Sequence, residues 1–463
     1  MAMAAAVAPA LGVTPAVPGC HADWPVVAHY AGGRVAPLPA GAKMPMACAA
    51  EIGYPTSEPS IVVTNGGVLV FSPAQTENSV ALSTDHGASW HLAYPPDEQY
   101  TALWNTDDPY LTVDRRTGRV FWVHATGPLR TAPLVVSESP LPGGLPTVLA
   151  AAYGFQVYST ADEGRSWTTA DYQTAPTGDW EKVFVGAPRA PRTGAPQPVG
   201  YPDVVYVCAN SPLEVAGPGR LCYRSLDGAR TFVPAGYIFP SLTAPLSCPA
   251  LATNNGVVSR DGTVYQPVGC SDGSYVAVST DEGGTYRWHK LPQAPGTGAG
   301  VDDHNFQIAI DGADQLYALW VCNGVLCLAT SADGATSWST PLRVAAPAVR
   351  SVTFPQLAAG PAGHVGVVYY GTRSTTAQRL TAYITESNNA RDQRPIFISG
   401  ALNDPARPIF VDYGLTGGSP RADYVGAAYD PSGVLWAGLV KLLSTPDASG
   451  NVRTAGYVGR LAG

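Results

Sequence analysis

The chain carries a short pattern at Ser279-Thr280-Asp281-Glu282-Gly283-Gly284-Thr285-Tyr286 that recurs along its 463 residues. Each copy contains a serine, an aspartate, a glycine, a small hydroxyl residue and an aromatic residue. The aspartate can accept backbone N–H bonds inside a tight turn, and the glycine permits a positive φ. The pattern therefore predicts a turn between two antiparallel strands. The other copies occupy residues 83–90, 159–167, 225–232 and 331–338.

A second repeat accompanies the first and consists of two short apolar segments separated by a Gly or Asp turn. Successive copies begin about 50 to 70 residues apart. Units of this length fit four-stranded blades better than the 20 to 30 residues of a solenoid repeat. We therefore expect an all-β, seven-bladed β-propeller, with six blades as the alternative if one unit is an insertion. The seven units begin near residues 58, 108, 179, 248, 305, 354 and 423.

A closed ring requires the two ends of the chain to share a blade. The candidate N-terminal strand is Val26-Val27-Ala28-His29-Tyr30, which we expect to complete the sheet formed by residues 424–443. Residues 1–19 are apolar and uncharged, so we interpret them as an N-terminal arm or the remnant of an export signal. Residues 20–463 are expected to form a single propeller domain.

Composition restricts the partners and the compartment. The net charge of -8 does not suit a nucleic-acid partner, and no apolar run is long enough for a transmembrane helix. Eight cysteines without a C-x-x-C motif favour disulfides, and hence a secreted protein. Two pairs would face each other across hairpins, Cys208 with Cys222 and Cys322 with Cys327. The other expected pairs are Cys20 with Cys48 and Cys248 with Cys270.

The serine and aspartate turn resembles the Asp-box (BNR repeat) of sialidases and of other β-propellers in that superfamily. In that family the turn joins the third and fourth strands of a blade, away from the catalytic face. The resemblance covers most of the chain and implies its architecture. It implies much less about its chemistry.

Ligands of propellers bind at the axial mouth, where the innermost strands begin. Polar groups gather at these positions, although only 13% of the chain is charged. Such a ring of groups suits a hydrophilic ligand such as a sugar. Each residue also has a structural interpretation, as a strand start, a solvated pair or a packed side chain. The candidate substrate-binding residues are Arg421, Lys182, Glu58, Gln307, Gln356 and Trp180.

The resemblance to sialidases implies a tyrosine nucleophile, a glutamate that activates it and an aspartate that acts as acid and base. These roles fall on Tyr424, Glu181 and Asp108. The family also binds the substrate carboxylate with three arginines, and here the pattern departs. Glu58-Pro59-Ser60 replaces the early Phe-Arg-Ile-Pro motif, and Arg421 is the one arginine at a convincing position, with Arg350 a weaker second.

We therefore expect a secreted, monomeric carbohydrate-active enzyme, a sialidase-like glycoside hydrolase acting on a polar or acidic glycan. One alternative is a polysaccharide lyase, with His304 as base, Tyr424 as acid, and Arg421 or Lys182 neutralising a uronate carboxylate. Another is a non-catalytic propeller that binds glycan or protein. No cofactor is expected. A structural Ca²⁺ could be held only among Asp302, Asp303 and Asp311, which lack EF-hand spacing.

Overall fold

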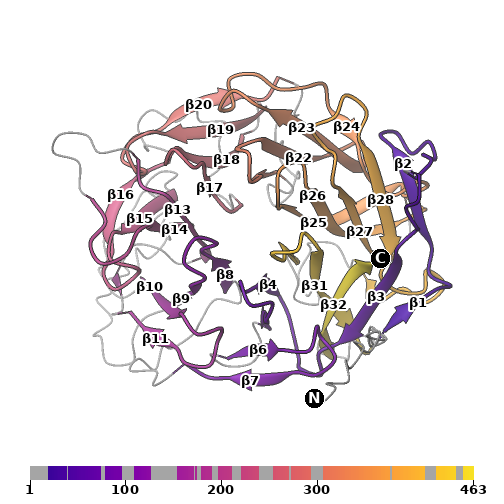
Figure 1. Cartoon of the computed structure of the whole chain (residues 1–463), viewed down its shortest axis with the longest axis horizontal. Coiled ribbons are helices and arrows are strands. Elements are labelled where there is room, and N and C mark those ends of the chain that lie inside the picture. Colours follow the sequence, from indigo (N-terminus) through magenta and orange to yellow (C-terminus); the bar gives the residue numbers. More distant parts are fainter. Residues whose placement is uncertain are drawn as a thin grey trace, which may run out of the picture.

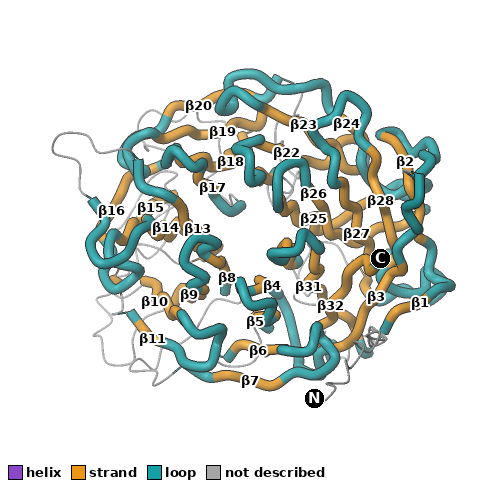
Figure 2. Tube along the Cα trace, viewed as in Figure 1, coloured by secondary structure: helices purple, strands orange, loops and turns teal. Residues whose placement is uncertain are grey.

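A computed structural model of the chain describes residues 19–38, 40–73, 79–95, 109–126, 154–170, 173–174, 179–189, 197–210, 220–238, 254–270, 273–292, 306–375, 378–411, 424–444 and 452–463. These residues form seven antiparallel sheets arranged radially around a central axis (Figure 1). The described part contains strands, turns and loops but no helix, and so no helix able to cross a membrane (Figure 2). The chain is a seven-bladed β-propeller, so the expected fold is confirmed and the six-bladed alternative is wrong.

Blades 1 to 5 each contain consecutive strands, ordered from the axis to the rim. Blade 1 contains β4 (Ser60–Val63), β5 (Leu69–Ser72), β6 (Val80–Ser83) and β7 (His91–Ala93). Blade 2 contains β8 (Tyr110–Val113), β9 (Val120–Thr126), β10 (Gly154–Thr160), β11 (Thr168–Thr169) and β12 (Gln173–Thr174). Blade 3 contains β13 (Asp179–Gly186), β14 (Val204–Asn210), β15 (Arg220–Ser225) and β16 (Val233–Tyr237). Blade 4 contains β17 (Val257–Val258), β18 (Val264–Cys270), β19 (Gly273–Ser279) and β20 (Arg287–Lys290). Blade 5 contains β21 (Gln307–Ile310), β22 (Leu316–Cys322), β23 (Val325–Ser331) and β24 (Leu342–Arg343).

The last two blades combine strands from both ends of the chain. Blade 6 contains β25 (Ser351–Ala359), β26 (Val365–Thr372), β27 (Arg379–Ser387), β28 (Ile396–Ala401), β29 (Phe410–Val411) and the N-terminal β2 (Val26–Tyr30). Blade 7 contains β30 (Gly426–Tyr429), β31 (Leu435–Leu442), β32 (Thr454–Ala462) and the N-terminal β3 (Met46–Glu51) and β1 (Cys20–His21).

Ring closure differs from the expectation. Val26–Tyr30 does not complete blade 7 but pairs with β28 at the outer edge of blade 6. The reason lies in His29, which is fully buried and whose Nε2 lies 2.8 Å from the Ser399 hydroxyl of that blade. Blade 7 is completed by β3, with Met46 opposite Ala462. The N-terminal segment therefore joins two blades instead of one.

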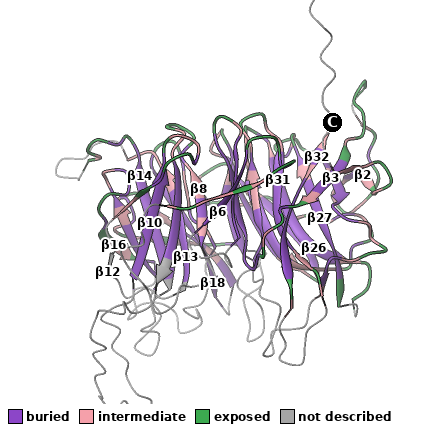
Figure 3. Cartoon of the chain, turned by 90° about the horizontal axis from the view of Figure 1, so that it is seen from below, coloured by how far each residue is buried: buried purple, intermediate pink, exposed green. Residues whose placement is uncertain are grey.

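The core lies between neighbouring blades. Phe121 and Val123 of blade 2 pack in one cluster with Val183 and Val205 of blade 3. Successive side chains of a strand point to opposite faces, and each face of a blade meets another blade. The strands are therefore largely buried while the turns at the blade ends are exposed (Figure 3). This explains why many strands read as continuous apolar runs.

The five serine and aspartate turns join the third and fourth strands of blades 1 to 5, as expected. In the first of them the Asp85 carboxylate accepts hydrogen bonds from the Ser83 hydroxyl at 2.8 Å and the Ser89 hydroxyl at 2.6 Å. The Trp90 indole donates to the Gly87 carbonyl at 3.2 Å and covers the turn. Hydrogen bonds from Ser89 lower the pKa of Asp85 to about 2.

Blade 6 has a related turn that the sequence pattern did not reveal. The Ser387 hydroxyl donates to the side-chain oxygen of Asn389 at 3.1 Å, and the Ile396 N–H donates to the same oxygen at 3.0 Å. An asparagine thus takes the place of the aspartate. The Ser-x-Asn spacing was the available signal.

Three of the four expected disulfides are present, Cys20–Cys48, Cys208–Cys222 and Cys322–Cys327. Cys208 and Cys222 lie directly opposite each other on β14 and β15. Cys322 lies opposite Val325, so that bridge runs diagonally across its hairpin and not between facing residues. Cys270 is also disulfide-bonded, and its expected partner Cys248 lies outside the described residues.

Candidate functional site

The inner strands surround an axial cavity of about 540 Å³. Its wall is mostly aliphatic, so the few polar side chains that reach it define its chemistry. A cavity of this size is in the range that accepts small ligands. Every blade contributes to it, with Ile61, Tyr110, Phe184, Val257, Gln307, Gln356 and Ala427 as one lining residue from each.

Two inner strands contain a β-bulge. On β13 the register shifts between Asp179 and Lys182, and on β25 it shifts between Thr353 and Gln356. Each bulge places an aromatic residue at positive φ, Trp180 at 56° and Phe354 at 47°. Bulky residues rarely adopt this conformation, which costs on the order of 1–3 kcal/mol. Such strain gathers at ligand sites, where bulges redirect side chains.

Lys182 follows the first bulge and is only 1% exposed. Its Nζ lies 4.3 Å from the ring centre of Trp180, 4.5 Å from that of Tyr424 and 5.0 Å from that of Tyr110. The three rings belong to blades 3, 7 and 2. A desolvated ammonium gains about 2 kcal/mol from such contacts. The structure therefore holds Lys182 in an aromatic cage assembled from three blades.

Tyr424 is fixed by contacts from two other blades. Its ring packs edge-to-face on Trp180, with 5.5 Å between the ring centroids. Its hydroxyl donates to the Pro109 carbonyl at 3.2 Å, and the Ser60 hydroxyl donates to the same carbonyl at 3.1 Å. One backbone carbonyl therefore joins blades 1, 2 and 7 at the end of the axis where the first strands begin.

Four charged side chains are buried near the strand starts at this end of the axis, and none of them lines the axial cavity: Glu58, Glu181, Lys182 and Arg220. The Arg220 guanidinium donates to the Trp180 carbonyl at 3.4 Å and to the Cys208 carbonyl at 3.3 Å. Burial of charge is costly unless opposite charges or hydrogen bonds compensate it, and both signs occur here. We use the name mouth cluster for Glu58, Tyr110, Trp180, Glu181, Lys182, Arg220 and Tyr424.

Two glutamines on the cavity wall have different environments. The Gln307 side chain accepts the Leu357 N–H at 2.6 Å and donates to the Pro355 carbonyl, so it fixes the second bulge. Gln356 lies between those two residues and is 5% exposed. Its Oε1 has no hydrogen-bond partner within the described part of the chain. An unsatisfied amide oxygen on the cavity wall can accept a hydrogen bond from a ligand.

Tyr110 contributes its ring to the cage but does not titrate near neutral pH. Burial raises its pKa to about 12, although a hydrogen bond with Asn255 opposes the shift. The phenol of Tyr110 therefore stays neutral. Asn255 lines the cavity as well, and its side-chain oxygen is buried without a hydrogen-bond partner among the described residues.

The structure brings together several of the predicted site residues. Trp180, Lys182 and Tyr424 are in contact, and Glu58 and Glu181 are buried in strand starts of the same end. Gln307 and Gln356 line the axial cavity, which the other five residues do not. Asp108, His304 and Arg421 lie outside the described residues.

Sequence reasoning missed Tyr110 and Arg220. Tyr110 is the second residue after Asp108 and was read as part of an apolar strand. Arg220 begins a third strand after a Pro/Gly-rich connection, whereas the expected site was restricted to the starts of first strands. A buried arginine adjacent to a hairpin cysteine carries no distinctive pattern of its own.

Of the three acidic residues considered for Ca²⁺, the structure describes Asp311. The Asp311 carboxylate accepts hydrogen bonds from the Tyr317 hydroxyl at 3.0 Å and the Gly363 N–H at 2.7 Å, besides two from its own turn. Asp302 and Asp303 lie outside the described residues. Within the described ranges, no three His, Cys, Asp or Glu side chains are grouped to bind a metal.

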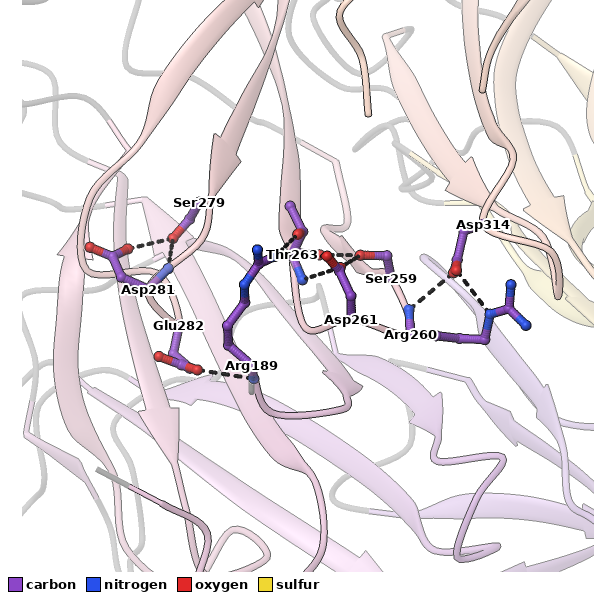
Figure 4. Close-up of polar contacts among 9 residues, drawn as sticks. All are labelled: Arg189, Ser259, Arg260, Asp261, Thr263, Ser279, Asp281, Glu282 and Asp314. Carbon is purple, nitrogen blue, oxygen red and sulfur yellow. Dashed lines mark hydrogen bonds and ion pairs between the residues drawn. The ribbon is translucent and has the colours of Figure 1, made fainter. Parts of the chain in front are cut away.

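The other end of the cavity, here called the turn face, consists of the hairpin turns between first and second strands. Its charged residues pair between blades, with 2.8 Å for Arg189 to Asp261 and 2.8 Å for Arg260 to Asp314. Figure 4 shows these pairs with the turn of Asp281. Arg189 also donates its backbone N–H to Glu282 at 3.0 Å. The turn face therefore uses charge to link neighbouring blades.

No protein-family model and no curated protein matches the chain. Solved structures resemble it at low identity. The intramolecular trans-sialidase from Ruminococcus gnavus is 14% identical, with 88% of this chain and 94% of that chain covered and a TM-score of 0.41. A streptogramin B lyase is 11% identical, with 89% and 98% covered and a TM-score of 0.44. A protein of unknown function from Dyadobacter fermentans is 14% identical, with 96% and 100% covered and a TM-score of 0.40. Values this low carry no conclusion about activity.

Proposed function

We propose that the chain is a carbohydrate-active enzyme, a sialidase-like glycoside hydrolase that cleaves an acidic glycan at the mouth cluster. The observation that carries the proposal is the caged Lys182 ammonium, which lies 4.5 Å from the ring centre of Tyr424. In this proposal the ammonium neutralises part of the negative charge that develops on the phenol oxygen as Tyr424 reacts. Tyr424 is thereby suited to act as a nucleophile.

In this proposal four residues of the mouth cluster act together with Asp108 and Gln356. Tyr424 attacks the anomeric carbon while Glu181 takes its proton, and Asp108 protonates the departing glycosidic oxygen. Water then cleaves the tyrosyl-glycan bond, with Asp108 as the base. Lys182 and Arg220 supply the positive charge that an acidic substrate requires. Gln356 accepts a hydrogen bond from a sugar hydroxyl on the cavity wall.

A non-catalytic glycan-binding propeller is the second candidate, and one observation favours it. Tyr424 is 4% exposed, and its hydroxyl donates to a backbone carbonyl, which is also the environment of a structural tyrosine. In this alternative the aromatic cage and Gln356 only bind the sugar. A polysaccharide lyase, with His304 as the base, is a third outcome that the assay below separates.

The test is to incubate the protein with sialylated, uronic and neutral glycans. Hydrolysis releases reducing ends without an unsaturated product, whereas elimination also gives ultraviolet absorbance of the new double bond. Tyr424→Phe is expected to lower kcat by about 10⁴-fold or more. Binding without either product would exclude both enzymatic proposals.

Tyr457→Phe is the matched control. Tyr457 lies in the same blade, and its buried hydroxyl also donates to a backbone carbonyl, that of Leu402 at 2.8 Å. It is not part of the mouth cluster. Equal losses of activity in the two variants would show that both act through stability and would remove Tyr424 from the mechanism.

We also infer that the serine and aspartate turns are Asp-boxes and that the protein is exported. Support for export comes from the three disulfides, which persist in oxidising compartments. Migration of the cell-derived protein on non-reducing gels before and after reduction tests this inference. Free thiols in protein taken from its native compartment would contradict it.

A further inference from the structure

A second cavity, of about 350 Å³, lies on the rim between blades 5 and 6. There β2 of the N-terminal segment lies beside β24 (Figure 1). We call this cavity the rim groove. Its walls are the turn at residues 32–33, the hairpin tip at residues 323–325 and the connection at residues 343–350.

The walls of the rim groove are built from fixed turns. The Gly32 N–H donates to the Arg343 carbonyl at 2.9 Å, which ties the N-terminal turn to blade 5. The Val349 N–H donates to the Ala346 carbonyl at 3.1 Å and closes a turn in which Ala348 has a φ of 70°. A non-glycine residue at such a φ is strained, and strained residues gather at ligand sites.

The charge of the rim groove is positive and uncompensated. Arg343 and Arg350 line it with exposed side chains, and its described lining contains no aspartate or glutamate. The ion pairs of the described residues use other cations, namely Arg116, Arg189, Arg260, Arg407 and Lys441. Both guanidiniums are therefore available to an anion from outside.

The surroundings strengthen this field. The chain has a net charge of -8, whereas the charged residues that line the groove are two arginines. Beside the groove, the Arg394 guanidinium lies 3.9 Å and that of Arg34 5.4 Å from the ring centre of Tyr30. A locally positive surface on an acidic protein attracts anions selectively.

We propose that the rim groove binds a carboxylate or sulfate group of an acidic polysaccharide. Arginine recognises such groups through two parallel hydrogen bonds, and two arginines in one groove set the spacing of the bound anion. The volume is at the lower end of the range for small-ligand pockets, which suits a sugar residue of a longer chain. The proposal rests on the proposed function, since it gives the same class of substrate a second attachment point.

The experiment measures binding of polygalacturonate and of heparin by calorimetry at low ionic strength, where screening is weak. Arg343→Ala and Arg350→Ala are each expected to weaken binding about tenfold, equivalent to about 1.4 kcal/mol. Arg379→Ala is the control, because it removes the same charge from an exposed position of blade 6 that does not line the groove. It is expected to bind within about twofold of the wild type, the change typical of a distant surface substitution.

Free galacturonate and inorganic sulfate distinguish the source of the anion. Weak binding of these probes beside strong binding of the polymers supports the proposal. An equal loss in Arg379→Ala would reveal diffuse attraction, and a wild type that binds sulfate but neither polymer would have only a small-anion site. Either result overturns the proposal. The assay is repeated on Tyr424→Phe, where binding must persist, so failure of the hydrolase proposal is recognised separately.

Discussion

The two ends of the propeller axis use charge in opposite ways. On the turn face, Arg260 is 72% exposed and bonds directly to Asp314 of the next blade at 2.8 Å. In the mouth cluster, Lys182 is 1% exposed and lies among three aromatic rings beside a strained bulge. The first arrangement links solvated turns, which is a structural task. The second confines a cation where water is excluded, which is an arrangement that catalytic and binding sites use.

Removal of the caged Lys182 charge is expected to have the largest effect on stability and activity. Lys182→Met should lower the free energy of unfolding by about 3–5 kcal/mol, because buried opposite charges lose their compensation. It should also abolish glycan cleavage. Chemical denaturation and the glycan assay measure the two effects. A variant as stable and active as the wild type would place Lys182 in an ordinary packing role.

The two cavity glutamines offer a matched pair. Gln307→Leu should cost about 2–4 kcal/mol, because it leaves the Leu357 N–H and the Pro355 carbonyl without their partner. Gln356→Leu should leave stability nearly unchanged, since its Oε1 has no partner to lose among the described residues. It should instead weaken glycan binding. If the two variants lose equal stability, the distinction between support and contact is wrong.

A carboxyl group near the turn face should respond to pH. Burial raises the pKa of Glu386 from 4.5 to about 7, although a hydrogen bond from the backbone of Leu435 opposes the shift. A raised pKa gives stability that is full below about pH 4.5 and is lost as the pH rises to about 7. Thermal melting across this range measures the loss. Glu386→Gln should flatten the profile in that window, and an unchanged profile would contradict the assignment.

The smallest effect is expected on the turn face. Arg260→Ala should change the free energy of unfolding by about 1 kcal/mol or less, because solvent and salt screen exposed pairs. Glycan cleavage should not change. Chemical denaturation of the variant and of the wild type at two salt concentrations checks this. The difference between their free energies of unfolding should be smaller at high salt. A loss comparable to that of Lys182→Met would erase the contrast between the two ends.

Repetition made the fold predictable. Five similar turns at regular spacing indicate a blade architecture even where single strands are ambiguous, because each copy confirms the others. The same regularity misled the assignment of ring closure. Val26–Tyr30 and Met46–Glu51 are both short apolar strands. Nothing in the sequence of either strand indicates that His29 forms a hydrogen bond with Ser399 of blade 6.

The candidate site was only partly predictable. Strand starts converge in a propeller, so Trp180, Lys182 and Tyr424 could be grouped from topology alone. The bulge at Trp180 could not, because an extra residue in a strand leaves no mark in composition. Arg220 was missed because it approaches from a third strand, and only the folded chain shows its bonds to the Trp180 and Cys208 carbonyls.

The way in which β3 pairs with β32 has a consequence for biogenesis. The Cys20–Cys48 bridge spans 28 residues, so β1 and β3 can be joined as soon as both reach an oxidising compartment. Their partner, Thr454–Ala462, is synthesised about 400 residues later. Until then blade 7 has an open hydrogen-bonding edge, which is vulnerable to aggregation and proteolysis. The disulfide-bonded pair of β1 and β3 thus offers a preformed edge for β32. The rate of ring closure then depends on how quickly β32 pairs with β3.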